Sequence, residues 1–177
     1  KRSSFFNESE WIKSLKIKIS ISKLKNFQRA EEMFSRTNQF NTSHKLLNKT
    51  DILKLSKEKG SFIYQISMND KFGDYGIISI VCIKHTIKSF HIYHFLQSCR
   101  VFKRNVEQVV LNFILNEKTF KNKQGYILIK RNEKNKYVQN LFDKSAYLTK
   151  KGSSLYKVSK NFKFDYIKKL GIKIIKV

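Results

Sequence analysis

The chain has 177 residues, with 37 Lys and Arg against 13 Asp and Glu and a formal net charge of +24. Hydrophobic residues make up 41% and aromatic residues 14%, which is enough for one sizeable core and excludes a disordered basic tail. No apolar run approaches the ~18 residues of a membrane span, and the first residues lack the apolar core of a signal peptide. We therefore expect a cytoplasmic protein whose residues 1–177 form a single domain. Because residue 1 is Lys, we also expect a further segment upstream.

The two cysteines, Cys82 and Cys99, and four histidines are too few for a disulfide framework or a structural zinc site. We predict free thiols and no metal site.

The positive charge favours nucleic acid as a partner, but its composition weakens that interpretation. Only six of the 37 basic residues are Arg, whereas nucleic-acid readers favour Arg for its bidentate geometry. The excess is Lys, it accompanies abundant Asn and Ile with no Pro, and this combination is typical of an AT-rich genome. The basic residues also form no discrete arm. A nucleic-acid-binding domain remains an alternative, and an acidic protein partner fits the charge equally well.

The first half of the chain predicts alternating strands and helices. Residues 15–21 alternate apolar and polar side chains, which indicates a strand with one buried face. Asn26 is a candidate cap for a short helix over 27–35, and the polar stretch 36–41 is expected to lie outside the core. The elements that follow are a short helix from Thr50-Asp51 to Gly60, a strand over 62–67 and a turn at 70–74.

The second half begins with a strand over 76–83 that is nearly continuously apolar, as in a central strand buried on both faces. It forms a predicted hairpin with residues 90–98. The later elements are an amphipathic helix over 105–120, a strand at 126–129, a helix over 135–145 and strand-like segments at 155–158 and 172–177. The connection from residue 98 to residue 126 should place two parallel strands side by side. This order predicts an α/β fold with a central mixed sheet flanked by helices.

Four blocks carry a family resemblance. They are Ile19-Ser20-Ile21-Ser22-Lys23-Leu24, Arg36-Thr37-Asn38-Gln39-Phe40-Asn41, Asp70-Lys71-Phe72-Gly73-Asp74-Tyr75-Gly76-Ile77, and Phe95 to Val101 with Val106-Glu107 following. A weaker match is Lys134-Asn135. With these blocks the chain resembles a GCN5-related N-acetyltransferase (GNAT) fold, and more closely the C-terminal GNAT-like domain of FkbH-like proteins of the HAD superfamily, subfamily IIIC. The resemblance places the core at about residues 11–150, with extra strands over 151–177.

This resemblance implies an acyl-handling function. FkbH-like proteins couple a HAD phosphatase domain to the GNAT-like domain, and relatives move a glyceryl group to the phosphopantetheine thiol of an acyl carrier protein. The Mg²⁺-binding DxD motif of the phosphatase does not occur here, since Asp70 and Asp74 are four apart in a turn. The phosphatase would therefore lie upstream. The expected function is transfer of an acyl or glyceryl thioester to or from a carrier protein. The alternatives are a non-catalytic carrier-docking module and an acetyl-CoA:amine acetyltransferase.

The resemblance also implies a binding site for coenzyme A or phosphopantetheine where the strand ending near Ser98 meets the next helix. GNAT proteins bind pyrophosphate there through main-chain N–H groups, with the pattern R-x-x-G-x-G. This chain has Lys103 and Asn105 at the two glycine positions. Arg100, Lys103, Arg104 and Asn105 are the candidate ligands, and the alternative is a loop that only packs the helix on the sheet.

Two residues are candidates for catalysis. Cys99 lies beside Arg100 near a helix N-terminus, where a thiol could carry an acyl group as a thioester, and the alternative is a small packing residue. His94 is a candidate general base or a structural histidine. In a regular strand His91 and His94 would face opposite sides.

Polar residues with no evident packing role complete the predicted site. Arg36, Asn38 and Gln39 are expected to contact substrate or carrier protein, unless they only form a hydrogen-bonded turn. Asp74 and Asn135 are further candidates for polar contacts. Many GNAT enzymes have a proton-donating Tyr in the last helix, and its counterpart here is Phe142, which counts against amine acetylation.

Overall fold

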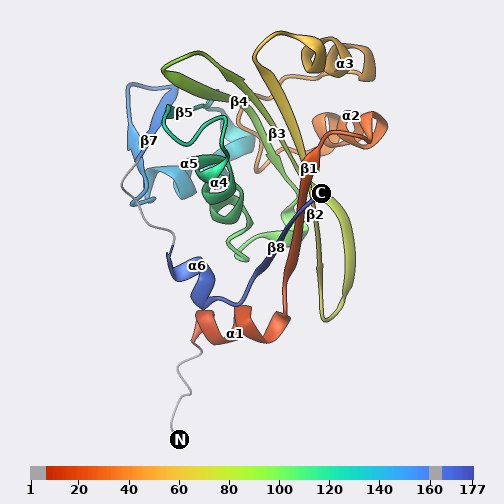
Figure 1. Cartoon of the computed structure of the whole chain (residues 1–177), viewed down its shortest axis with the longest axis vertical. Helices are drawn as coiled ribbons and strands as arrows, with labels where there is room; N and C mark the ends of the chain where they lie inside the picture. Colours follow the sequence, from red (N-terminus) through yellow and green to blue (C-terminus); the bar gives the residue numbers. More distant parts are fainter. Residues whose placement is uncertain (1–6, 160–164) are drawn as a thin grey trace, which may run out of the picture.

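The computed structural model describes residues 7–159 and 165–177, and within them eight strands form one sheet in the order β6-β7-β5-β4-β3-β2-β1-β8 (Figure 1). The strands are β1 (Lys18–Lys23), β2 (Ser61–Asp70), β3 (Gly73–His85), β4 (Ser89–Gln97), β5 (Gln124–Leu128), β6 (Leu148–Lys150), β7 (Leu155–Val158) and β8 (Lys173–Lys176). The mixed sheet predicted from the sequence is confirmed.

Helices cover both faces of this sheet (Figure 1). They are α1 (Glu8–Leu15), α2 (Phe27–Arg36), α3 (Lys49–Lys57), α4 (Val106–Asn116), α5 (Lys136–Asp143) and α6 (Asp165–Lys169), with short 3₁₀ turns η1 (Cys99–Val101) and η2 (Glu133–Asn135). The larger hydrophobic core lies under α4 and α5, and a smaller one lies under α2 and α3. The two cores follow from the alternation of side chains along buried strands.

Strands β1 to β4 are antiparallel neighbours, and β5 then pairs parallel with β4. This parallel pair is the one predicted from the crossover between residues 98 and 126. Its register joins only the first half of β4, Ser89–Ile92, to Gln124–Ile127. The second half of β4 therefore has an edge that β5 does not cover.

Strand β4 contains an irregularity in its pairing with β3 between the pairs Cys82–His94 and Ile83–Ile92. One residue more on β4 than on β3 is a β-bulge, which interrupts the alternation of faces. The His91 and Tyr93 rings stack on one side of the strand, and His94 packs against Phe34 of α2 on that same side. The expectation that His91 and His94 face opposite sides is therefore wrong, because it assumed a regular strand.

The beginning of the described chain differs from the sequence-based prediction. Residues 15–21 were expected to form a strand, whereas α1 extends to Leu15 and β1 begins at Lys18. The Asn7 side chain accepts a hydrogen bond from the Ser9 N–H and caps α1, and Ile12 and Leu15 are buried at helical spacing. Leu15 thus ends α1, and Ile17 lies in the connection between α1 and β1.

Other boundaries moved by a few residues. The Asn26 side chain caps α2 as predicted, but α3 begins at Lys49, after a capping box formed by Asn48 and Asp51. Helix α4 ends at Asn116 rather than at residue 120. The short elements β6 and α6 had no predicted counterpart.

The polar stretch 36–41 is not wholly outside the core, contrary to the sequence-based expectation. Phe40 and Asn41 are 0% and 1% exposed. Asn41 forms an isolated antiparallel bridge with Leu96 of β4. Phe40 and Asn41 are buried because they lie on the edge of β4 that β5 leaves uncovered.

Candidate functional site

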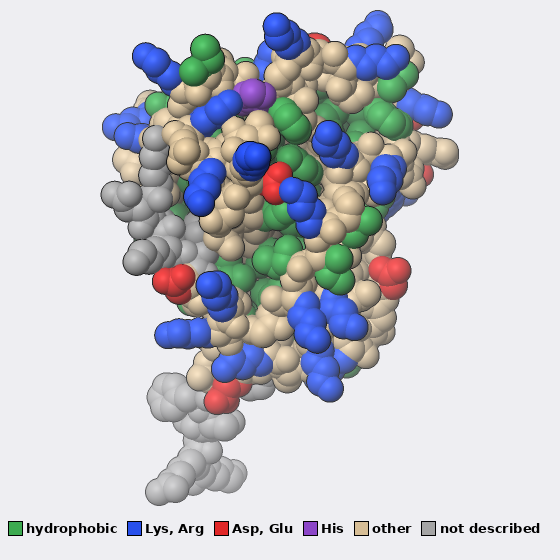
Figure 2. All heavy atoms as spheres, viewed as in Figure 1, with side chains coloured by type: hydrophobic (Ala, Val, Ile, Leu, Met, Phe, Trp, Pro, Cys, Tyr) green, Lys and Arg blue, Asp and Glu red, His purple; other side chains and the backbone are tan. Residues whose placement is uncertain are grey.

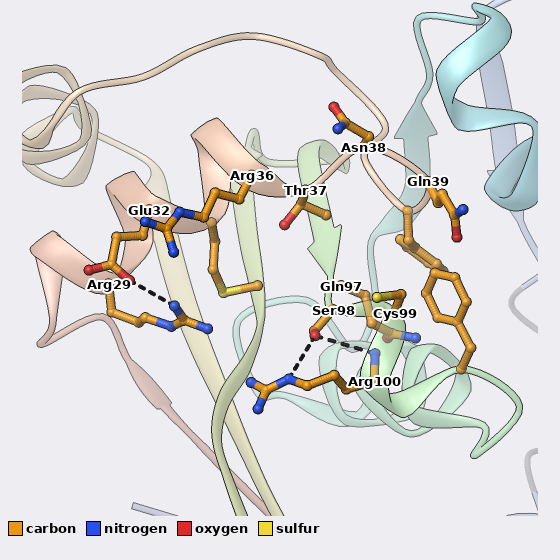
Figure 3. Close-up of a pocket in the computed structure, with 13 residues that line it drawn as sticks. Arg29, Glu32, Arg36, Thr37, Asn38, Gln39, Gln97, Ser98, Cys99 and Arg100 are labelled. Carbon is orange, nitrogen blue, oxygen red and sulfur yellow. Dashed lines mark hydrogen bonds and ion pairs between the residues drawn. The ribbon is translucent and has the colours of Figure 1, made fainter.

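A cavity of about 480 Å³ lies between the end of α2 and the end of β4 (Figure 3). Side chains of α2 line one side of it, and the segment that leaves β4 lines the other. Its lining residues are Arg29, Glu32, Met33, Arg36, Thr37, Asn38, Gln39, Phe40, Gln97, Ser98, Cys99, Arg100 and Phe102. The cavity therefore opens at the carboxyl end of a strand, where α/β proteins commonly bind ligands.

Five residues that the sequence marked as candidates meet in this cavity: Arg36, Asn38, Gln39, Cys99 and Arg100. Arg36 is the last residue of α2, and Asn38 and Gln39 come directly after that helix. Cys99 and Arg100 belong to η1. Two stretches distant in the chain thus contribute to one site. The Ser98 hydroxyl accepts a hydrogen bond from the Arg100 N–H and caps η1, which fixes where Cys99 lies.

The two cysteines have opposite environments. Cys99 is exposed and lines the cavity, and its thiol is free. Cys82 lies inside β3 and is 2% exposed, and burial raises the pKa of its thiol because desolvation disfavours the thiolate. Cys99 is therefore the thiol available to a substrate.

Guanidinium groups dominate the charge around the cavity. Arg29 forms an ion pair of 2.7 Å with Glu32 one turn later on α2. Arg100 donates to the Ser98 hydroxyl at 3.3 Å and to the Tyr75 carbonyl at 3.1 Å. Arg36 forms no ion pair among the residues that the structure describes, so its charge remains available to an anionic ligand.

Gln97 is a site residue that the sequence reasoning missed. It is 1% exposed, its Nε2 donates to Oε2 of Glu107 at 3.4 Å, and its Oε1 has no hydrogen-bond partner among the described residues. Burial raises the pKa of Glu107, with hydrogen bonds from Gln97 and Gln108 acting in the other direction. A polar side chain directly after the apolar pair Phe95-Leu96, at the end of the strand, was the signal that could have identified Gln97.

The loop after η1 has two residues in a backbone conformation that usually favours glycine. Lys103 and Asn105, at the two glycine positions, both adopt left-handed conformations, with φ of 61° and 57°. Arg104 is committed elsewhere, since it forms a 3.0 Å ion pair with the buried carboxylate of Asp70 and lies 4.7 Å from the Tyr75 ring. Lys103, Arg104 and Asn105 do not line the cavity.

Three other candidates also lie outside the cavity. His94 is on the α2 and α3 side of the sheet, packed edge-on against Phe34 at 5.3 Å, and burial lowers its pKa to about 4. Asp74 is an exposed residue at the start of β3, where its side chain accepts a hydrogen bond from the Gly76 N–H at 2.8 Å. Asn135 is 0% exposed and donates to the main-chain carbonyls of Asn41 and Lys130.

Strands β4 and β5 pair only over Ser89–Ile92 and Gln124–Ile127, which leaves a gap between their carboxyl ends where an extended ligand such as a coenzyme A arm could pair with β4. Here the chain itself fills that gap. The Gln97 N–H donates to the Phe40 carbonyl at 3.0 Å, and the Thr42 N–H donates to the Phe95 carbonyl at 3.2 Å. On the other side, the Lys130 N–H donates to the Thr42 carbonyl at 2.7 Å. The described residues therefore do not fit a coenzyme A arm between these strands.

Lys and Arg side chains are spread over the face shown in Figure 2 and do not gather into one stripe. Within residues 7–159 and 165–177, none of the helices has the length and apolar character that a membrane crossing requires. The same residues contain no cluster of three or more His, Cys, Asp or Glu side chains suited to a metal ion.

No protein-family model matches the chain, and no curated protein matches it in sequence. Solved structures do match. The ribosomal-protein-S18-alanine N-acetyltransferase from Escherichia coli has 11% identity and a TM-score of 0.54, covering 82% of this chain and 99% of its own. An acetyltransferase from Thermus thermophilus has 10% identity and a TM-score of 0.56, covering 79% and 96%. Ard1 from Thermoplasma volcanium has 12% identity and a TM-score of 0.50, covering 78% and 94%. The chain therefore has the fold of the GNAT acetyltransferases, as the sequence predicted.

Proposed function

We propose that this chain is the acyl-handling domain of an FkbH-like protein. It takes an acyl or glyceryl group from one thioester onto Cys99 and passes it to the phosphopantetheine thiol of an acyl carrier protein. The observation that carries the proposal is the cavity in which an exposed thiol, the Arg36 guanidinium and the buried Gln97 side chain meet.

The proposed chemistry is two thioester exchanges. The Cys99 sulfur attacks the carbonyl carbon of the arriving thioester, a new C–S bond forms, and the C–S bond to the arriving thiol breaks. The departing sulfur takes up one proton for the one that Cys99 gave up. The second exchange reverses these bonds toward a second thiol. No atom is oxidised or reduced, so the described side chains need no redox partner.

The charged and polar side chains that line the cavity would recognise the phosphopantetheine arm of the carrier protein. A phosphopantetheine arm ends in a phosphodiester, which suits the guanidinium groups of Arg36 and Arg100. Its amide groups suit the exposed side-chain amides of Asn38 and Gln39, which line the cavity. Asn38 and Gln39 would line the rim that faces the carrier protein.

The partners follow from charge and from the sequence resemblance. Carrier proteins are usually acidic, so a chain of net charge +24 would attract them and accelerate the encounter. The HAD phosphatase domain with its Mg²⁺ would lie upstream of residue 1 and supply the glyceryl group.

A second candidate function is carrier docking without catalysis. Phe142, the residue at the position of the GNAT tyrosine, is 0% exposed and has no proton to donate. The filled gap between β4 and β5 favours the same alternative. In that case the cavity would hold the arm while the upstream domain performs the chemistry.

Mass spectrometry tests the proposal directly. The chain, joined to its native upstream region, is incubated with a glyceryl- or acyl-pantetheine thioester, and peptides containing Cys99 and Cys82 are compared. We expect an acyl adduct on Cys99 but not on Cys82, and its loss in Cys99→Ala. Transfer to the carrier protein that persists in Cys99→Ala would overturn the catalytic proposal and support docking. Arg131 lies outside the cavity, where it forms an ion pair with Asp143, and it supplies the control. Loss of carrier binding in Arg36→Gln, but not in Arg131→Gln, would place the arm in the cavity.

A further inference from the structure

The segment Gln39–Thr42 extends the sheet beside β4 through an isolated bridge between Asn41 and Leu96 and through main-chain hydrogen bonds on both of its sides. Its main chain bonds to β4 on one side through Phe40 and Thr42, and to Lys130 beyond β5 on the other. The Thr42 side chain also takes part, since its Oγ1 accepts a hydrogen bond of 3.0 Å from the Phe95 N–H. These bonds satisfy the edge of β4 that β5 does not reach.

The Phe40 side chain also packs this segment into the larger hydrophobic core. The Phe40 ring lies 5.0 Å from Phe95 and 6.0 Å from Phe142, both in edge-to-face geometry, and it is 0% exposed. The Phe102 and Tyr137 rings stack at 3.8 Å beside it. A fully buried phenylalanine in the larger core is part of the folded structure and not a lid over it.

The segment fills the gap between the carboxyl ends of β4 and β5, and ligands commonly bind at such a position in an α/β sheet. Two parallel strands that diverge at their carboxyl ends leave a crevice, and open α/β sheets bind ligands there. An extended arm with amide groups would pair with the free edge of β4 as an added strand does. Residues 40–42 already make those pairings.

We infer that residues 40–42 determine which thioesters this chain accepts. They replace the arm of a free acyl-coenzyme A between β4 and β5, so the chain does not bind acyl-coenzyme A there and takes its thioester only at the cavity around Arg36 and Cys99. The second half of this inference rests on the proposed function. The first half stands on the hydrogen bonds and burial of the segment alone.

The same segment borders both the cavity and the gap between β4 and β5. Phe40 lies directly behind the cavity, where it is 0% exposed, while its main-chain carbonyl bonds to β4 in the gap. The Gln39 carbonyl accepts a hydrogen bond from the Val138 N–H of α5 at 3.3 Å, which ties the start of the segment to that helix. The segment therefore forms the wall between the cavity and the interior of the sheet, and a thioester in the cavity reaches Cys99 without entering the gap.

Amide hydrogen exchange with and without acetyl-coenzyme A tests the inference on the unmodified chain. The informative amides are those of Thr42, Gln97 and Lys130, which hold the segment in the gap. We expect all three to be protected and unchanged by acetyl-coenzyme A. Altered exchange confined to residues 36–39 and 98–100 would also support the inference, because the ligand would then be in the cavity. Saturable binding with altered exchange at Thr42 and Lys130 would overturn it.

A pair of variants tests whether the segment is part of the sheet. Thr42→Val keeps the shape of the side chain but removes the acceptor for the Phe95 N–H, and the matched control is Thr149→Val on an exposed position of β6. We expect exchange at Gln97 to be about tenfold faster in Thr42→Val than in the control. Equal exchange in both variants would overturn the inference even if Cys99 is acylated. Acylation that fails while the segment stays protected would instead count only against the proposed function.

Discussion

The side-chain amide of Asn135 donates a hydrogen bond of 2.9 Å to the main-chain carbonyl of Asn41, 94 positions earlier in the chain. The same Nδ2 donates to the Lys130 carbonyl at 3.0 Å, and Oδ1 accepts from Gln139 and from the Asn132 N–H. One buried side chain thus joins the segment in the β4–β5 gap to the turn before α5. Asn135 was predicted to contact a substrate or partner, and in the structure it contacts the chain itself.

The first prediction concerns this residue. Asn135→Ala removes the donor for two main-chain carbonyls that stay buried, so we expect the free energy of unfolding to fall by about 2–4 kcal/mol. The change is measured by urea unfolding. Asn140→Ala, at an exposed position of α5, is the control and should change stability by less than about 0.5 kcal/mol. A loss no greater than that of the control would show that Asn135 does not hold the segment.

The second prediction concerns pH. Burial, together with the charge of Lys45, lowers the pKa of His94 from 6.5 to about 4. The unfolded state therefore binds more protons than the folded state between these values, and stability falls as the pH decreases from about 6.5 to about 4. The full loss for a residue 8% exposed is roughly 3 kcal/mol.

His94→Phe removes this titration and keeps an aromatic ring beside Phe34. We expect its stability to depend less on pH in that window, measured by urea unfolding at several pH values. His44 and His91, whose pKa values burial also lowers, are present in both proteins and supply a common background. Identical pH profiles for the two proteins would show that His94 is not buried in the neutral form.

The third prediction concerns Gly125 in β5. A Cβ at this position would lie 2.5 Å from Cζ of Phe90 on the neighbouring strand. We expect Gly125→Ala to destabilise the fold by about 1–3 kcal/mol through overpacking. Phe90→Leu in the same chain shortens the opposing side chain and should recover part of that loss, measured as a rise in the thermal midpoint over Gly125→Ala. Additive losses in the double variant would contradict the contact.

The fourth prediction concerns Lys103, whose φ of 61° is in the left-handed region. Lys103→Val places a β-branched side chain where it is strained and should cost about 1–3 kcal/mol. Lys103→Gly relieves strain but increases the freedom of the unfolded chain, so it should lie within about 1 kcal/mol of the parent chain. Equal losses for Val and Gly, measured by urea unfolding, would mean that the backbone conformation of the loop is not the cause.

Local patterns were sufficient to predict most of the sheet and its parallel pair. The apolar run at 76–83 predicted a buried central strand, and β3 covers it with residues Ile78 to Ile83 buried. The helical spacing at 27–35 predicted α2 to within a residue. These elements were predictable because burial of one face leaves a fixed period in the sequence.

The features that the sequence did not predict depend on residues that are distant in the chain. Phe40 and Asn41 lie in a stretch that is polar by composition, and they are buried only because β4 and Asn135 supply partners for their main chain. His94 lies on the same face of β4 as His91 because of a β-bulge that no local pattern reveals. In the site, Arg36 and Cys99 were chosen separately from the sequence, but only the structure shows that they share one cavity.

Strand β8 pairs in parallel with β1, so residues 173–176 cover the edge formed by residues 18–21. During synthesis at about 5–20 residues per second, the outer edge of β1 stays uncovered for roughly 10–30 s after it emerges. An uncovered edge is a template for pairing with other chains. Aggregation of nascent chains should therefore respond to mutations in β8, although its side chains lie far in sequence from the strand they protect.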